Sequence, residues 1–197
     1  TGAPLPEGAD TILIQENAHV SNGLVIATQA EPRGRFVRSA GLDFKTGDVL
    51  LTAGTRLGAR ELGLVAAMNH ATVSVRRKPR VGILATGDEL VLPGEIPGPD
   101  QIVASNNLAV AAAVEAAGGE ALLLGIAADT FDSLEGSIRA AREAGVDLLV
   151  TIGGASVGEH DLVQSALRHE GMDLGFWRIA MRPGKPLLFG ALGQTRI

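Results

Sequence analysis

Four short segments supply acidic or basic side chains, and three of them also contain glycine; these are the residue types that bind phosphate and divalent metal ions. They are Thr86-Gly87-Asp88-Glu89, an aspartate at 129, the run 153–161 (GGASVGEHD) and the basic turn 182–185 (RPGK). The Gly153-Gly154 pair allows a tight turn and leaves main-chain amides open to an anion. Carboxylates bind hard cations such as magnesium. Together the segments predict a site for an anion and a metal.

Each segment also has a purely structural explanation when it is taken alone. A glycine pair commonly ends a strand, and acids at 159 and 161 fit the first turn of a helix, where the dipole favours negative charge. The four histidines form no HExxH pair, which argues against a histidine-based catalytic zinc site. Neither GxxxxGK[ST] nor GxGxxG occurs. The case for a site therefore depends on whether the segments converge.

The elements between these segments predict that they do converge. From residue 80 onward the sequence alternates short apolar strands with amphipathic helices. We expect strands at 81–85, 121–126 and 147–152, helices from Ser105 or Asn106 to Ala117, from Asp132 to Ala144 and over 160–170, and a strand pair at 175–181 and 187–192. This order predicts an α/β fold with a mostly parallel sheet and helices on both faces. Ligands bind such sheets at the carboxyl ends of the strands, directly before the four segments.

The first part of the chain has a different pattern. Residues 1–57 are rich in turns, with short strands expected at 11–15, 23–28, 34–39 and 48–52. A helix within 55–68 and an extended stretch then lead to the α/β part. We predict a small β-rich domain at 1–57, a linker helix and strand at 58–79, and an α/β domain at 80–197.

Glu135, three residues after Asp132, predicts a capping box for the second helix of the α/β part.

Composition narrows the possible functions. The net charge of −5 and the 3% aromatic content disfavour a nucleic-acid-binding surface. No cysteine is present, which excludes disulfides and thiol catalysis and is compatible with a cytoplasmic location. No apolar run approaches the roughly 20 residues of a membrane span. The chain begins at Thr1 without methionine and ends soon after an expected strand, so we expect it to be a piece of a longer protein.

Seven motifs give the sequence a specific resemblance. RVGILATGDEL (80–90), IVASNN (102–107), TIGGASVGEHD (151–161) and MRPGKP (181–186) occur in order, after TGAPLPEGAD, SAGLDFKTGD and LTAGTRL in the first part. Together they resemble the molybdopterin molybdotransferases, a family that includes the C-terminal domain of gephyrin. The resemblance covers essentially the whole chain and implies the molybdopterin-binding fold. It further implies that molybdenum from molybdate is inserted into adenylylated molybdopterin, with release of AMP.

The resemblance also implies roles for individual residues. The family's functional acids correspond to Asp43, Glu89, Asp129 and Asp161, the last three also binding magnesium. Asp43 would lie near a cleft facing the partner protomer of a homodimer, and an upstream adenylyltransferase would be a partner. The expected ligand-binding residues are Thr86, Gly87, Ser105, Asn106, Gly153, Gly154, Ser156, Gly158, Arg178, Arg182 and Lys185. Arg178 and Arg182 stand where many relatives have lysine, so the charge is kept but the geometry differs.

Two alternatives remain open. A gephyrin-like assembly module would use the same fold without chemistry, and the related molybdopterin adenylyltransferase has a similar glycine-rich domain. The β-rich first part argues against the adenylyltransferase, which lacks it. We also expect that residues 1–197 alone bind ligand weakly, because the family has further segments on both sides.

Overall fold

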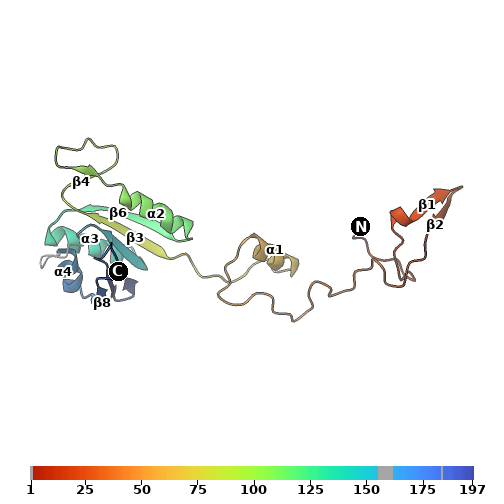
Figure 1. The fold of residues 1–197 in the computed structure, drawn as a ribbon. Helices are drawn as coiled ribbons and strands as arrows, with labels where there is room; N and C mark the ends of the chain where they lie inside the picture. The colour runs from red at the N-terminus through yellow and green to blue at the C-terminus, as the bar shows by residue number, and fades with distance from the viewer. Residues whose placement is uncertain (1, 155–161, 183) are drawn as a thin grey trace. The chain divides into compact units, whose positions relative to one another are not determined.

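The computed structural model describes residues 2–154, 162–182 and 184–197, and it divides the chain into two compact units. The first unit comprises residues 1–73 and the second residues 74–197 (Figure 1). The division falls within the stretch 58–79, where the sequence predicts a linker. Each unit is described by itself.

The first unit has one hairpin and one α-helix among its described residues. A 3₁₀ turn (η1, Gln15–Asn17) precedes β1 (Ala18–Ser21), which pairs antiparallel with β2 (Leu24–Ala27). Asn22 and Gly23 join the strands with φ of 51° and 77°, the positive values that two-residue hairpin turns require. The helix α1 (Ala59–Ala67) begins where the Gly58 N–H donates to the Glu61 carboxylate at 2.9 Å.

Three strands that the sequence predicts in this unit are wrong. Residues 11–15, 34–39 and 48–52 contain no strand, and only 24–27 of the predicted 23–28 is one. Segments 10–12 and 34–35 contact each other through isolated bonds, from the Ile12 N–H to the Arg35 carbonyl (3.2 Å) and from the Gly34 N–H to the Asp10 carbonyl (2.7 Å). Frequent glycine and proline keep these contacts from extending into a ladder.

The second unit contains a six-stranded sheet. Its strands are β3 (Arg80–Thr86), β6 (Glu120–Ala127), β7 (Leu148–Ile152), β8 (Asp173–Trp177), β9 (Leu188–Leu192) and β10 (Thr195–Arg196), in the order β6-β3-β7-β10-β9-β8. β6, β3, β7 and β10 are parallel; β9 is antiparallel to β10, and β8 to β9. β8 therefore runs in the same direction as β7. The mostly parallel sheet confirms the predicted α/β class.

Three helices cover the sheet. The helix α2 (Asn106–Ala116) packs on β6 and β3, and α3 (Phe131–Glu143) and α4 (Leu162–His169) lie on the opposite face (Figure 1). The predicted capping box of the second helix is wrong, because Thr130 caps α3 by accepting the Ser133 N–H at 3.4 Å. Glu135 instead points inward and contacts His169 and Arg139.

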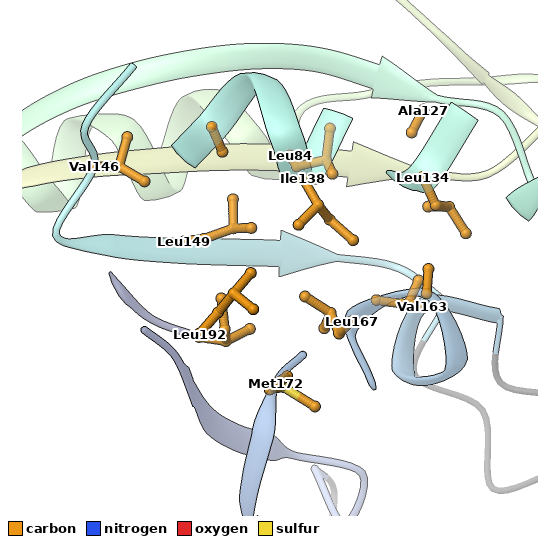
Figure 2. Close-up of a cluster of buried hydrophobic side chains, with 13 residues drawn as sticks. Leu84, Ala127, Leu134, Ile138, Val146, Leu149, Val163, Leu167, Met172 and Leu192 are labelled. Atoms are coloured by element: carbon orange, nitrogen blue, oxygen red, sulfur yellow. The ribbon is translucent and has the colours of Figure 1, made fainter. Parts of the chain in front are cut away.

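The main hydrophobic core lies between the sheet and the helices α3 and α4 (Figure 2). Leu134 and Ile138 of α3 pack with Leu149 of β7 and Leu167 of α4, and all four are at most 1% exposed. Full burial of such a side chain contributes roughly 1.5–3 kcal/mol. This core fixes both helices on the sheet and so positions the loop that precedes α3.

Asp147 stabilises the amino ends of the strands β3 and β7. Arg77 donates two hydrogen bonds of 2.6 Å to its carboxylate, and the Arg80 backbone N–H donates a third at 2.7 Å. These bonds, with those from Arg77 contributing most, lower the pKa of Asp147 to about 2. The linker end of the unit is thereby held to the start of β3 and β7.

In the described ranges, none of the helices has the length and apolar character of a membrane span.

Candidate active site

The carboxyl ends of four parallel strands form one edge of the sheet. β3 ends at Thr86, β6 at Ala127, β7 at Ile152 and β8 at Trp177. The segments that the sequence singles out follow these ends directly. We call this edge the rim.

A cavity of about 230 Å³ opens at the rim beside the end of β3. It forms because the short strands β4 (Leu90–Val91) and β5 (Ile102–Val103) pair in parallel and bring 102–107 next to Thr86 and Glu89. The Ile102 N–H donates to the Glu89 carbonyl at 2.8 Å. The predicted ligand residues that line the cavity are Thr86, Glu89, Ser105, Asn106 and Gly153. Residues far apart in the sequence therefore share one wall.

The glycine pair is packed against Thr86 so closely that no side chain fits. Gly153 has φ of +103°, and a Cβ there would lie 2.3 Å from the Thr86 carbonyl oxygen and 2.9 Å from its hydroxyl. Gly154 has φ of +63°, and its Cβ would lie 2.3 Å from Val163 of α4. The pair thus needs glycine both for its conformation and for the close approach.

Thr86 has a buried hydroxyl that no described residue satisfies. Its side chain is 1% exposed, and its hydroxyl has no hydrogen-bond partner in the described part of the chain. Leaving a buried hydroxyl unsatisfied costs about 1–3 kcal/mol. The hydroxyl faces the glycine pair. Its position suits a polar ligand atom held between β3 and the glycine pair.

The acids Asp88, Glu89 and Asp129 gather at the ends of β3 and β6. The Asp129 backbone N–H donates to the Asp88 carboxylate at 3.0 Å, and Glu89 folds back over Gly87. Desolvation raises the pKa of Asp129, and the negative charges of Asp88 and Glu89 raise it further. Asp88 is absent from the predicted site residues, although its place within TGDEL is a signal for it. Its visible role is to hold the loop that carries Asp129.

The fit of this cluster to magnesium is partial. The residues that the structure describes contain no group of three His, Cys, Asp or Glu side chains able to hold a metal ion. The third predicted metal ligand, Asp161, lies outside them, as do Ser156 and Gly158. The donor chemistry does suit magnesium, because carboxylate oxygens are its preferred protein ligands. Desolvation raises the pKa of Asp129 most, and the charges of Asp88 and Glu89 add to the shift, so a nearby cation would favour its ionised form.

The predicted cations lie after β8, at the other end of the sheet. Arg178 directly follows the strand, and its N–H donates to the Leu187 carbonyl at 2.9 Å. The Ile179 N–H donates to the Lys185 carbonyl at 3.0 Å, which closes the turn. Arg178, Arg182 and Lys185 pair with no carboxylate of the described residues. The rim is therefore acidic at β3 and β6 and basic at β8.

Asp43 belongs to the first unit, where its side chain is exposed. Its predicted place near a cleft that faces a partner protomer remains a prediction.

Comparison with known families yields two matches. The family described as "Probable molybdopterin binding domain" matches residues 82–196, and the "MoeA N-terminal region (domain I and II)" matches residues 1–69. The first match contains the whole rim.

Individual relatives agree with these matches. A Nostoc protein named molybdopterin molybdenumtransferase is 40% identical over 95% of this chain and 43% of its own length, and a Haemophilus influenzae protein of the same name is 37% identical over 98% and 47%. A crystal structure of a molybdopterin biosynthesis moea protein from Pyrococcus horikosii superimposes with a TM-score of 0.80 at 33% identity, covering 100% of this chain and 48% of that one. The chain thus spans under half the length of these relatives.

Proposed function

Because this chain belongs to the family of probable molybdopterin-binding domains, we propose that it is part of a molybdopterin molybdotransferase. The proposed enzyme inserts molybdenum from molybdate into adenylylated molybdopterin and releases AMP. Relatives of that name that match nearly the whole chain support the proposal. The single observation that carries it is the rim cavity, in which the TGDEL, VASNN and glycine-pair segments meet.

In this proposal the cavity binds the phosphate-bearing part of the substrate. The main-chain amides of Gly153 and Gly154 and the hydroxyl of Thr86 donate to phosphate oxygens. Ser105 and Asn106 lie at the start of α2, where free N–H groups and the helix dipole favour an anion. The unpartnered Thr86 hydroxyl supports this assignment, because a bound oxygen would satisfy it.

The acids would hold magnesium. Glu89 and Asp129, with Asp161, are the proposed ligands, and Asp88 keeps the Asp129 loop in place through its backbone bond. When bound, magnesium would supply positive charge that neutralises the phosphate oxygens of the substrate. Desolvation raises the pKa of Asp129 most and the charges of Asp88 and Glu89 raise it further, and a cation here would offset that second effect.

Lys185, Arg182 and Arg178 would balance the remaining negative charge of the substrate. Asp43, a homodimer, an upstream adenylyltransferase and a cytoplasmic location remain predictions of the sequence. The match of residues 1–69 to the MoeA N-terminal region favours the molybdotransferase over the adenylyltransferase, which lacks that region.

The decisive test is AMP release by the intact protein with Glu89→Gln. Removing one preorganised electrostatic group from a catalytic site lowers turnover by about 10²–10³-fold. The matched control is Glu115→Gln, an exposed acid on α2 away from the rim, which should leave AMP release unchanged. If Glu89→Gln releases AMP within twofold of the parent protein, the proposed role of the rim fails, and a non-enzymatic assembly role becomes the better explanation.

A further inference from the structure

The loop that follows β6 carries Asp129, and hydrogen bonds hold its backbone from three directions. The Asp129 N–H donates to the Asp88 carboxylate, in the loop after β3, at 3.0 Å. The Ala128 N–H donates to the Ser133 hydroxyl of α3 at 3.1 Å. The Thr130 N–H donates to the Ala128 carbonyl at 2.7 Å. Each backbone N–H from 128 to 130 therefore has an acceptor, and the loop is bound to both β3 and α3.

Ser133 lies in the first turn of α3 and takes part in a reciprocal cap. Its own N–H donates to the Thr130 hydroxyl at 3.4 Å, while its hydroxyl accepts the Ala128 N–H. In a regular capping box the third helical residue reaches back to the N–H of the N-cap residue. Here it reaches two residues further, to the residue directly before Asp129. The Ser133 side chain therefore binds the Asp129 loop to the helix.

A bulge in β6 sets how far this loop extends along the rim. Ile83 of β3 pairs with Leu123 of β6. Two residues later Ala85 pairs with Ile126, which is three residues after Leu123, so β6 holds one residue more than β3. Gly125, within the bulge, has φ of +83°, and a Cβ added there would meet no described atom within 4 Å. The bulge thus favours glycine for its conformation and not for lack of space.

The extra residue of β6 brings Asp129 level with Asp88. Thr86 pairs with Ala127, so Asp88 and Asp129 each lie two residues beyond the same pair. Without the extra residue Thr86 would pair with Ile126, and Asp129 would lie one residue, about 3.3 Å, further along. A one-residue shift of a strand also exchanges the faces to which its side chains point. The bond from the Asp129 N–H to Asp88 depends on the observed register.

We infer that Gly125 and Ser133 are positioning residues for Asp129. The bulge at Gly125 sets the level of the loop, and the Ser133 hydroxyl holds the loop at that level. Neither residue is among those that bind the substrate in the proposed function. The inference rests on the proposed function for the catalytic role of Asp129, whereas the geometry of the loop is independent of it.

Amide hydrogen exchange of the intact protein tests the loop geometry without a ligand. Ser133→Ala removes the acceptor of the Ala128 N–H, so exchange at residues 128–130 should accelerate about fivefold, the usual effect of one hydrogen bond. Ser137→Ala is the matched control. Ser137 is half-buried on the same helix, and its hydroxyl donates to the Ser133 carbonyl at 2.9 Å instead of contacting the loop. Its loss should leave exchange at 128–130 unchanged.

The kinetics of AMP release test the consequence for Asp129. Small displacements of a catalytic group lower the rate strongly, so Ser133→Ala should reduce kcat about 10–100-fold and leave KM within about twofold of the parent. Ser133→Thr keeps a hydroxyl and should restore most of kcat, and Ser137→Ala should change neither constant. Equal losses of kcat in Ser133→Ala and Ser137→Ala would overturn the inference, because they would indicate a general weakening of α3.

Two substitutions at Gly125 test the bulge. Asparagine tolerates a positive φ and β-branched valine does not, while a Cβ has space in either case. Gly125→Asn should therefore keep most of the activity, and Gly125→Val should lower kcat as Ser133→Ala does. Parent-like kcat in a folded Gly125→Val would refute the role of the bulge. Circular dichroism and thermal unfolding establish that each variant is folded, and the Ser133 series decides the inference if Gly125→Val is not.

The inference and the proposed function can fail separately. If Glu89→Gln lowers AMP release and Ser133→Ala does not, the positioning role fails alone. If Glu89→Gln leaves AMP release unchanged, the proposed function fails, and faster exchange at 128–130 in Ser133→Ala would still establish that Ser133 holds the loop.

Discussion

Replacing Gly153 by alanine tests the geometry on which the site depends. A Cβ at this position would lie 2.3 Å from the carbonyl oxygen of Thr86, and main-chain atoms of a buried strand cannot move aside easily. The backbone φ of +103° adds a second cost, since a side chain is disfavoured there. Gly153→Ala should therefore destabilise the second unit and move Thr86 away from its present position.

A second glycine separates the two costs. Gly171, just after α4, has a similar φ of +94°, but a Cβ added there would meet no described atom within 4 Å. Gly171→Ala should therefore show only the conformational cost, about 1–2 kcal/mol. Steric overlap adds about 1–3 kcal/mol at a packed position, so Gly153→Ala should cost about 2–5 kcal/mol in total.

Urea or thermal unfolding followed by tryptophan fluorescence measures the difference. Trp177 is the only tryptophan and belongs to the second unit, so its signal reports on that unit alone. For a chain of this size 1 kcal/mol corresponds to about 2–4 °C in Tm, so the two variants should differ by about 2–12 °C. If Gly153→Ala is no less stable than Gly171→Ala, the close approach of the glycine pair to Thr86 is refuted, together with the ligand role derived from it.

Three further substitutions have defined outcomes. The lowered pKa of Asp147 means that its stabilisation is present above about pH 4 and is lost as the pH falls towards 2, so Asp147→Asn should lower stability at pH 7 and flatten acid unfolding over that range. The pKa of Asp129 is raised, so its ionised form disfavours folding at neutral pH. Asp129→Asn should therefore raise the Tm at pH 7. At pH 3 the carboxyl is already protonated, so the same substitution should give no gain in Tm. Arg178→Gly should leave the free energy of unfolding unchanged or raise it by up to about 2 kcal/mol, as measured by urea unfolding. The reason is that Arg178 has φ of +99°, and relief of a backbone strain of about 1–3 kcal/mol offsets the entropic cost of glycine. A clear loss of stability would show that the arginine side chain stabilises the fold.

The strands and helices of the second unit could be predicted because burial leaves a direct pattern in the sequence. The apolar run at 81–85 appears as β3, and the helix expected from Ser105 or Asn106 appears as α2. β10 pairs through only two residues, too few to leave a pattern. In the first unit the same pattern predicted strands that do not form, because alternating apolar residues become a strand only where a partner strand exists. Val49 and Leu50, within one of the wrong strands, are exposed in the unit.

The cavity residues could be predicted for a topological reason. Parallel strands bring their carboxyl ends to one edge, so Thr86, Glu89 and Gly153 could be placed together without coordinates. The interactions between those residues could not be predicted from the sequence. The unsatisfied hydroxyl of Thr86 and the bonds from Asp129 to Asp88 and from Ala128 to Ser133 depend on side-chain directions that no spacing rule supplies.

Three destabilising features of the second unit all lie on its rim. A buried hydroxyl without a described partner, an aspartate whose ionisation its neighbours oppose and an arginine in a strained conformation each lower the stability of the fold. The opposite edge is different, since Asp147 is fully engaged by Arg77 and Arg80. A ligand with phosphate oxygens for the Thr86 hydroxyl and a cation beside the acids would relieve the first two. Binding of such a ligand should therefore stabilise the second unit, because it satisfies a buried hydroxyl and offsets negative charge that the free protein carries.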